Sequence, residues 1–410
     1  MNVTITPAKL KGKVTPPPSK SQAHRLIIAA ALADGESVLS NVAYSQDIEA
    51  TIRCMEQLGA EFARDGSTLT VRGLGASCRS PLRKIAPPRL DCGESGSTLR
   101  FLIPVALAVC GGGVFTGRGR LMERPQQPYF DLFDQKGISY ELKDGVLTVS
   151  GRLSPGEFRL PGDVSSQFFT GLMFALPLLD GDSRIVLTSP LESGGYVELT
   201  REVLRTAGIL TDGGSIPGKQ RYQPIRQTVE ADWSQAAFYY AAHGLGSDLL
   251  IQGLSPFSTQ ADTKIVPYYM ELCSSEEEVG LDVSQCPDLF PALALLASVR
   301  DGKITSIGGA ARLRIKESDR ISAVTEVLRA FGVPVEEYPD GISLSGVSAL
   351  TGNVTVDCHN DHRIAMMAAM AATRADGPVT LTGAECVAKS YPNFWEDYES
   401  LGGVIARSEV

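Results

Sequence analysis

The feature that most constrains this chain is a helical segment that recurs six times. The copies begin near residues 20, 95, 165, 234, 290 and 362. Most open on Ser, Asp or Asn, which favour helix N-caps, and end near Gly, which favours the position after a helix. Between these ends run Ala, Leu, Met and Phe residues that nearly encircle the predicted helix. Such helices are expected to be buried rather than to lie on the surface.

A second, amphipathic helix type alternates with the first. It is found in "DIEATIRCMEQLGAEF", "YVELTREVLRTAGI" and "SDRISAVTEVLRAFGVPVE", and a weaker copy is "TKIVPYYMELCSS". Short alternating strands such as "STLTVRG" and "GPVTLTG" fill the intervals. The spacing of roughly 55 to 75 residues exceeds solenoid repeats, so each unit is predicted to be a small βαβ-containing subdomain. The six copies divide into two groups of three at the Pro/Gly/Gln-rich stretch 218–232. The alternative to a true repeat is that Ala-rich helices resemble one another by chance.

Composition limits the classes of function. A chain of 410 residues favours two or more domains. Its net charge of -9, without a polybasic run, argues against a nucleic-acid partner and requires any cationic site to be local. No apolar stretch is long enough for a bilayer and no signal core is present, so a cytoplasmic protein without a membrane partner is expected. The eight scattered cysteines predict free thiols, with neither a metal site nor a disulfide framework.

Charged and polar residues collect at the starts of the buried-type helices. A helix N-terminus presents N–H donors and a partial positive charge, and Lys and Arg reinforce its attraction for anions. Several such starts in one cleft would bind multiply charged anions. The residues concerned are Lys20, Ser21, Arg25, Glu94, Ser95, Gly96, Ser97, Arg100, Arg124, Ser165, Ser166, Gln167, Asp288, Asp361, His362 and Arg363.

Each of these residues also has an ordinary structural interpretation. Any single Arg could form a surface ion pair, and Ser165 and Ser166 could be simple N-caps. His24 is expected on a helix surface, and His362 is expected to order its loop rather than transfer protons. The segment "RIKESDR" (314–320) could likewise be a capping and salt-bridge pattern.

Nine motifs in this order resemble the enolpyruvyl transferase family over nearly the whole chain. They are "PSKSQAHR", "ESGSTLRFL", "MERP", "DVSSQF", "LESGGY", "PDLFPALA", "RIKESDR", "NDHRIAM" and "AKSYPNFW". The resemblance implies an α/β (α+β) fold of two domains, each an inverse α/β barrel of three repeated βαβαββ-type subdomains. It places residues 19–221 in one domain and residues 1–18 with 222–410 in the other, with the active site in an interdomain cleft that closes on substrate.

The motifs are closest to the branch of the family that acts on shikimate 3-phosphate. The resemblance implies transfer of the enolpyruvyl group of phosphoenolpyruvate to the 5-hydroxyl of that substrate, with release of phosphate, in the shikimate pathway. This reaction needs no cofactor and no metal, in keeping with the missing P-loop and dinucleotide motifs. A monomer acting on two small polyanions is expected, and polyanionic substrates account for a cationic cluster in an acidic protein.

Matching motifs assign individual residues to the two substrates. For shikimate 3-phosphate they imply binding by Lys20, Ser21, Arg25, Ser165, Ser166, Gln167, Ser193, Tyr196, Asp288, Arg312 and Lys316. For phosphoenolpyruvate they imply Lys20, Gly96, Arg124, Gln167, Arg320, Arg363 and Lys389. The implied catalytic residues are Asp288, which accepts the hydroxyl proton, Glu317, which protonates the methylene carbon, and Lys20. Such a pair of acid and base fits addition and elimination through a tetrahedral intermediate.

Some positions depart from the family pattern. Glu94 stands where Asn is usual, Phe101 where some members have Pro, and Arg312 where some have Asn. These differences bear on affinity and glyphosate sensitivity rather than on the reaction. The rival within the family acts on UDP-N-acetylglucosamine, but its Lys-Asn pair is replaced by "SKS" and its cysteine loop has no counterpart here. A catalytically silent anion-binding relative is the second alternative.

Overall fold

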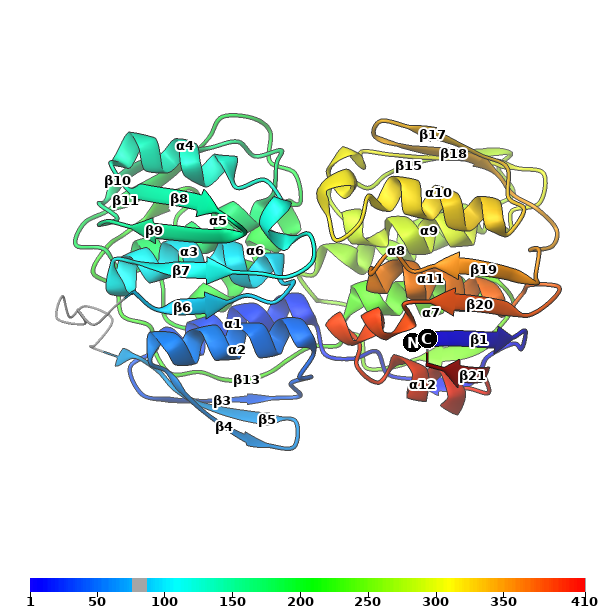
Figure 1. Cartoon of the computed structure of the whole chain (residues 1–410), viewed down its shortest axis with the longest axis horizontal. Helices are drawn as coiled ribbons and strands as arrows, with labels where there is room; N and C mark the ends of the chain where they lie inside the picture. The colour runs from blue at the N-terminus through cyan, green and yellow to red at the C-terminus, as the bar shows by residue number, and fades with distance from the viewer. Residues whose placement is uncertain (76–86, 410) are drawn as a thin grey trace. The chain divides into compact units, whose positions relative to one another are not determined.

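The computed structural model describes residues 1–75 and 87–409 and divides into two compact units (Figure 1). The central unit comprises Pro18–Glu230, and the terminal unit comprises Met1–Pro17 with Ala231–Val410. The second crossing between units therefore lies after residue 230, whereas the sequence-based division placed it after 221. The difference arises because strand β13 (Arg226–Thr228) pairs in parallel with β3 (Glu36–Ser40), which ties residues 222–230 to the central unit.

Three sheets of the central unit share one plan, in which a parallel pair is followed by antiparallel strands. The first sheet has the order β13-β3-β5-β4, with β5 at Thr68–Arg72 and β4 at Glu61–Asp65. The second has the order β6-β7-β9-β8, at Arg89–Asp91, Gly112–Thr116, Val146–Ser150 and Ser139–Lys143. The third is shorter, with the order β10-β11-β12 at Gly156–Leu160, Ser183–Leu187 and Ser215–Ile216.

The terminal unit repeats this plan. One sheet has the order β15-β16-β18-β17, at Glu278–Asp282, Ile304–Gly308, Gly341–Ser345 and Val335–Tyr338. Another has the order β19-β20-β1-β21, at Val354–Asp357, Val379–Thr382, Asn2–Thr6 and Val404–Ser408. The third is the parallel pair β14 (Asp248–Ile251) and β2 (Lys11–Val14). Strands β1 and β2 bring the chain start into the terminal unit, so its sheets join segments far apart in sequence.

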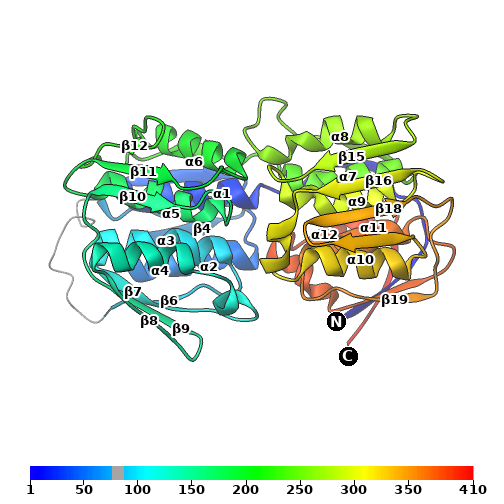
Figure 2. The ribbon, with the colours of Figure 1, turned by 90° about the horizontal axis from the view of Figure 1, so that it is seen from above.

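The two helix types are found where the sequence predicts them. The buried type comprises α1 (Lys20–Leu32), α3 (Gly96–Cys110), α5 (Ser166–Ala175), α7 (Trp233–Gly244), α9 (Phe290–Ala297) and α11 (His362–Ala372). Every residue of α9 and α11 is buried, as are eleven of the residues of α1. In Figure 2, α3 and α5 lie between the β10-β11-β12 sheet and the β6-β7-β9-β8 sheet of the central unit. Because the sheets lie on the outside and these helices lie inside, the helices need no polar face.

The alternating amphipathic helices are α2 (Gln46–Leu58), α4 (Gln127–Lys136), α6 (Gly194–Thr206), α8 (Ile265–Leu272), α10 (Arg320–Ala330) and α12 (Phe394–Ser400). The predicted N-caps are present at Ser19, Ser95, Ser165, Asp232 and Asp361, each of which accepts a hydrogen bond from a backbone N–H in the first turn. The exception is α9, which follows the 3₁₀ turn η5 (Pro287–Leu289) that carries Asp288. No helix among the described residues is long and apolar enough to cross a membrane.

Candidate functional site

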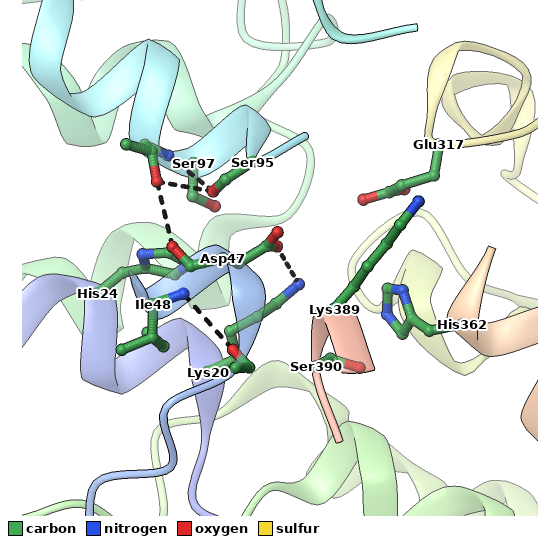
Figure 3. A network of polar contacts seen from close by, with 12 residues as sticks. Lys20, His24, Asp47, Ile48, Ser95, Ser97, Glu317, His362, Lys389 and Ser390 are labelled. Carbon is green, nitrogen blue, oxygen red and sulfur yellow. Dashed lines mark hydrogen bonds and ion pairs between the residues drawn. The ribbon is translucent and has the colours of Figure 1, made fainter. Parts of the chain in front are cut away.

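Lys20 lies in the first turn of α1, directly after its N-cap Ser19. Its ammonium donates a hydrogen bond to Asp47 Oδ2 at 2.8 Å, and both side chains are largely buried (Figure 3). Asp47 is in the first turn of α2, where the helix dipole also stabilises a carboxylate. Asp47 was not recognisable from the sequence as a partner of Lys20, because only the packing of α2 against α1 brings the two side chains together. The ion pair fixes Lys20 without fully burying it.

Arg25 lies one turn further along α1 and is only 2% exposed. Its guanidinium donates to Thr200 Oγ1 at 2.9 Å, to the Ser21 carbonyl at 2.7 Å and to the Tyr196 carbonyl at 3.2 Å. Burial lowers the pKa of Arg25 to about 10, so it remains cationic near neutral pH. Because these partners are uncharged, the cation retains its attraction for an anion.

Gly96 and Arg124 lie against each other. A Cβ atom at Gly96 would lie 2.6 Å from Arg124 Nη1 and 2.9 Å from Arg124 Cζ. Arg124 follows the 3₁₀ turn η2 (Leu121–Glu123) and is 7% exposed. Its Nε has no hydrogen-bond partner among the described residues, and a buried donor without a partner is unusual. An anion at the start of α3 would satisfy both this donor and the helix N-terminus.

We expect Gly96→Ala to raise the KM for phosphoenolpyruvate about tenfold, because the new methyl group must displace the Arg124 guanidinium. A tenfold change corresponds to a loss of about 1.4 kcal/mol of binding free energy. The KM for shikimate 3-phosphate should change less than twofold. Steady-state phosphate release with each substrate varied in turn measures both constants. An unchanged KM for phosphoenolpyruvate would show that the Gly96–Arg124 contact has no part in binding it.

Gln167 is held in one orientation by two neighbours. Its Oε1 accepts a hydrogen bond from Arg100 Nη1 at 2.9 Å, and its Nε2 donates to Ser97 Oγ at 3.1 Å. Arg100 also donates to the carbonyl of Pro125, which follows Arg124, at 2.8 Å. Arg100 was noted at its helix start but received no role from the sequence. The structure shows it linking α3, the Gln167 amide and the turn that carries Arg124.

The remaining predicted residues of the central unit lie at two helix starts. Ser165 is the N-cap of α5 and accepts a hydrogen bond from the Gln167 N–H at 3.3 Å. Ser193 precedes α6 with a left-handed φ of 55°, and the Tyr196 carbonyl binds Arg25. We refer to all predicted residues of this unit as the central cluster: Lys20, Ser21, Arg25, Gly96, Arg124, Ser165, Ser166, Gln167, Ser193 and Tyr196.

Arg320 is the centre of an ion-pair network in the terminal unit. Its guanidinium contacts Asp361 Oδ2 at 2.7 Å, Glu317 Oε2 at 2.8 Å and Asp288 Oδ1 at 2.9 Å. Arg320 is 1% exposed and Asp361 is fully buried. Burial lowers the pKa of Arg320, but its carboxylate neighbours, Asp361 first, outweigh this and raise it above the ordinary value. One permanently charged side chain thus fixes the predicted base and the predicted acid.

Asp288 is surrounded by cations. Arg363 Nη2 lies 2.8 Å from Asp288 Oδ2, and Lys316 Nζ lies 3.9 Å from Asp288 Oδ1. Burial raises the pKa of Asp288, but Arg363, Lys316 and Arg320 together outweigh it and hold the pKa well below its ordinary range. Asp288 is therefore ionised near neutral pH, as a proton acceptor must be.

Lys389 ends the 3₁₀ turn η7 (Ala384–Lys389), and its Nζ donates to the Asn360 carbonyl at 2.6 Å. In Figure 3 the Lys389 ammonium and the Glu317 carboxylate point toward each other. Arg312 lies in the 3₁₀ turn η6 (Ala311–Ile315) and donates to the Ser284 carbonyl at 2.6 Å. We refer to the predicted residues of this unit as the terminal cluster: Asp288, Arg312, Lys316, Glu317, Arg320, Arg363 and Lys389.

Asp361 is the residue of this unit whose role the sequence left undefined. Besides Arg320 it accepts hydrogen bonds from Ser318 Oγ at 3.0 Å and from the Arg363 N–H at 3.0 Å. Its N-cap position in "NDHRIAM" was recognisable, but its contact with Arg320 required tertiary packing. Across residues 1–75 and 87–409, no group of three or more His, Cys, Asp or Glu side chains is arranged to hold a metal ion.

Two predictions from the sequence concern histidine and cysteine. His24, expected on a helix surface, is completely buried because α1 is covered on all sides by its own unit. The seven described cysteines are free thiols, as predicted, and Cys78 lies outside the described residues.

Comparison with known proteins agrees with the family resemblance. The family model of EPSP synthase (3-phosphoshikimate 1-carboxyvinyltransferase) matches residues 5–398. A 3-phosphoshikimate 1-carboxyvinyltransferase of Clostridium beijerinckii is 43% identical over 98% of both chains, and one of Clostridium kluyveri is 44% identical over 98% of both. A solved EPSP synthase of Acinetobacter baumannii has a TM-score of 0.79 and 25% identity, and the match covers 99% of this chain and 100% of that one. The expected fold class is confirmed, and the chain belongs to the EPSP synthase (3-phosphoshikimate 1-carboxyvinyltransferase) family.

Proposed function

We propose that this enzyme transfers the enolpyruvyl group of phosphoenolpyruvate to the 5-hydroxyl of shikimate 3-phosphate and releases phosphate. The observation that carries the proposal is the terminal cluster, in which Arg320 contacts both the ionised Asp288 and Glu317. A base and a second carboxyl group joined by one guanidinium suit a reaction with two proton transfers. The names of the curated relatives support the same reaction.

The first step joins the two substrates. Asp288 accepts the proton of the 5-hydroxyl as its oxygen attacks C2 of phosphoenolpyruvate, and Glu317 donates a proton to C3. The product is a tetrahedral ketal that still carries the phosphate. In the second step the Glu317 carboxylate takes back a proton from C3, the C–O bond to phosphate breaks with its electron pair leaving on the phosphate, and the double bond between C2 and C3 forms again. The departing phosphate takes the proton held by Asp288, so both carboxyl groups return to their starting states. Lys20, Arg124, Arg363 and Lys389 stabilise the phosphate and carboxylate charges through both steps.

Both clusters are assigned to the same two substrates. In the central cluster, Ser21, Arg25, Ser165, Ser166, Ser193 and Tyr196 bind shikimate 3-phosphate, and Gly96 and Arg124 bind phosphoenolpyruvate. Lys20 and Gln167 contact both substrates. In the terminal cluster, Arg312 and Lys316 bind shikimate 3-phosphate, and Arg320, Arg363 and Lys389 bind phosphoenolpyruvate.

We further propose that the protein is a cytoplasmic monomer. Light scattering would measure its mass in solution.

A phosphate-release assay tests the reaction. The purified protein should release phosphate from phosphoenolpyruvate only when shikimate 3-phosphate is also present. Each substrate alone is the control. Equal release with UDP-N-acetylglucosamine would favour the rival enzyme of the family, and no release with either acceptor would favour a silent anion-binding relative. The curated relatives do not favour either alternative.

A further inference from the structure

A buried series of hydrogen-bonded polar side chains connects the N-terminal halves of α1, α2 and α3. His24 Nδ1 lies 2.7 Å from Thr51 Oγ1, and Thr51 Oγ1 lies 2.7 Å from Thr98 Oγ1. Thr98 Oγ1 lies 2.8 Å from Ser95 Oγ. All four side chains have an exposed fraction of 0%. They are therefore shielded from bulk solvent, and each broken link would leave a buried polar group without its partner.

The number of hydroxyl protons sets the direction of this chain. Thr98 donates its hydroxyl proton to Ser95 Oγ, and the other acceptor in range is the Asp47 carbonyl at 3.5 Å. In either case the single proton of Thr98 is used, so Thr51 must donate to Thr98. The proton of Thr51 is then used as well, so Nδ1 of His24 must carry a proton and donate to Thr51.

The surroundings of His24 keep its ring neutral. Burial lowers the pKa of His24 well below its ordinary value, and the neighbouring charges of Lys20 and Arg25 lower it further. Its Nε2 has no hydrogen-bond partner among the described residues, and the ring meets Phe101 edge to face with centroids 6.4 Å apart. A neutral imidazole with its proton on Nδ1 satisfies the hydrogen bond with Thr51, which is the one polar contact of this ring within residues 1–75 and 87–409.

The far end of the chain is next to the central cluster. Ser95 is the N-cap of α3 and accepts a hydrogen bond from the Thr98 N–H at 3.1 Å. The next residue is Gly96, against which Arg124 packs. The same helix α2 that carries Thr51 has Asp47 in its first turn, and the Asp47 carboxylate holds Lys20. This series of hydrogen bonds thus links the helix that presents Lys20 to the helix start that presents Gly96.

We propose that His24 and Thr51 are positioning residues, which hold the start of α3 in the orientation that phosphoenolpyruvate requires through a one-way hydrogen-bond chain beginning at His24 Nδ1–H. The inference rests on the proposed function for its kinetic part, since Gly96 and Arg124 are assigned to phosphoenolpyruvate there. The proton position on His24 does not depend on that function.

The kinetic test compares Thr51→Val, which removes the middle link at nearly constant shape, with Thr51→Ser, which keeps the hydroxyl. Thr51→Val should raise the KM for phosphoenolpyruvate about tenfold and the KM for shikimate 3-phosphate less than twofold. Thr51→Ser should restore the wild-type value to within about threefold. The matched control is Thr325→Val, because Thr325 is equally buried and its Oγ1 has no hydrogen-bond partner among the described residues.

A KM for phosphoenolpyruvate that is unchanged in Thr51→Val, or that rises equally in Thr325→Val, would overturn the positioning role. A second measurement uses the wild-type protein, so it stands even where the variant does not fold. Nitrogen NMR of histidine-labelled protein, with the His24 signals identified by their contact with the Phe101 ring, should show the His24 proton on Nδ1. A proton on Nε2 would overturn the chain, whereas inactive wild-type protein would count against the proposed function alone.

Discussion

Asp288→Asn should reduce kcat about a thousandfold while shikimate 3-phosphate still binds. The amide keeps the shape of the side chain but cannot accept the hydroxyl proton, and general base catalysis typically contributes factors of 10² to 10⁴. Loss of this charge also leaves Arg320, Arg363 and Lys316 with one fewer carboxylate neighbour. We therefore expect phosphoenolpyruvate to bind at least as tightly as in the wild type. Phosphate release measures kcat, and calorimetry measures both affinities.

The matched control is Asp248→Asn in the same unit. Asp248 pairs with Lys11 at 3.8 Å, and both side chains are more than 80% exposed. Exposed ion pairs contribute little, so kcat and both affinities should equal the wild-type values. An Asp288→Asn protein with wild-type turnover would remove Asp288 from the role of base and would leave the terminal cluster as a binding site only.

Arg320→Lys should destabilise the terminal unit and strongly reduce turnover. An ammonium cannot reproduce the planar fork that contacts Asp288, Glu317 and Asp361 together. Breaking a buried ion pair typically costs about 3–5 kcal/mol, and we expect a loss near the lower limit because a positive charge remains. The free energy of unfolding should fall by about 3 kcal/mol, and kcat/KM by at least about a hundredfold. Denaturant titration and phosphate release measure the two effects.

The pH profile gives an independent check on Arg320. In the wild type, the cations hold the pKa of Asp288 below its ordinary range, so the base is ionised even in mild acid. A weaker cation at position 320 raises that pKa, so the acidic limb of the kcat profile should move to higher pH. Arg329→Lys, an exposed position on the same helix, should leave the profile unchanged. An unshifted acidic limb in Arg320→Lys would show that Arg320 does not set the charge state of Asp288.

The repeated helices were predictable because their signals are local. Ser19, Ser95 and Asp232 each cap the helix that immediately follows. Apolar residues on all faces of α11 require burial wherever the helix lies in the fold. The order of the motifs then identified the family, and with it the residues of both clusters. The roles of those residues stay predictions until the kinetic tests are made.

Sequence patterns could not predict the contacts that set the charge state and orientation of these residues. Arg320 and Asp361 are separated by 41 positions, and Lys20 and Asp47 by 27, so no helical or strand period connects them. The same holds for His24, whose polar type favoured the surface but whose partner Thr51 lies on the next helix. Polar side chains can be buried when another helix supplies their hydrogen-bond partners, and that is known only once the helices are packed.

The sequence by itself thus determined the two helix types, their caps, the repeated subdomains and the family, because each depends on short-range pattern or motif order. Only the tertiary structure decided that Arg320 joins Asp288 to Glu317, that Asp47 holds Lys20, and that His24 is buried. The physical reason is that the charge state and orientation of a side chain are set by neighbours in space, and most of these neighbours come from other helices and turns of the fold.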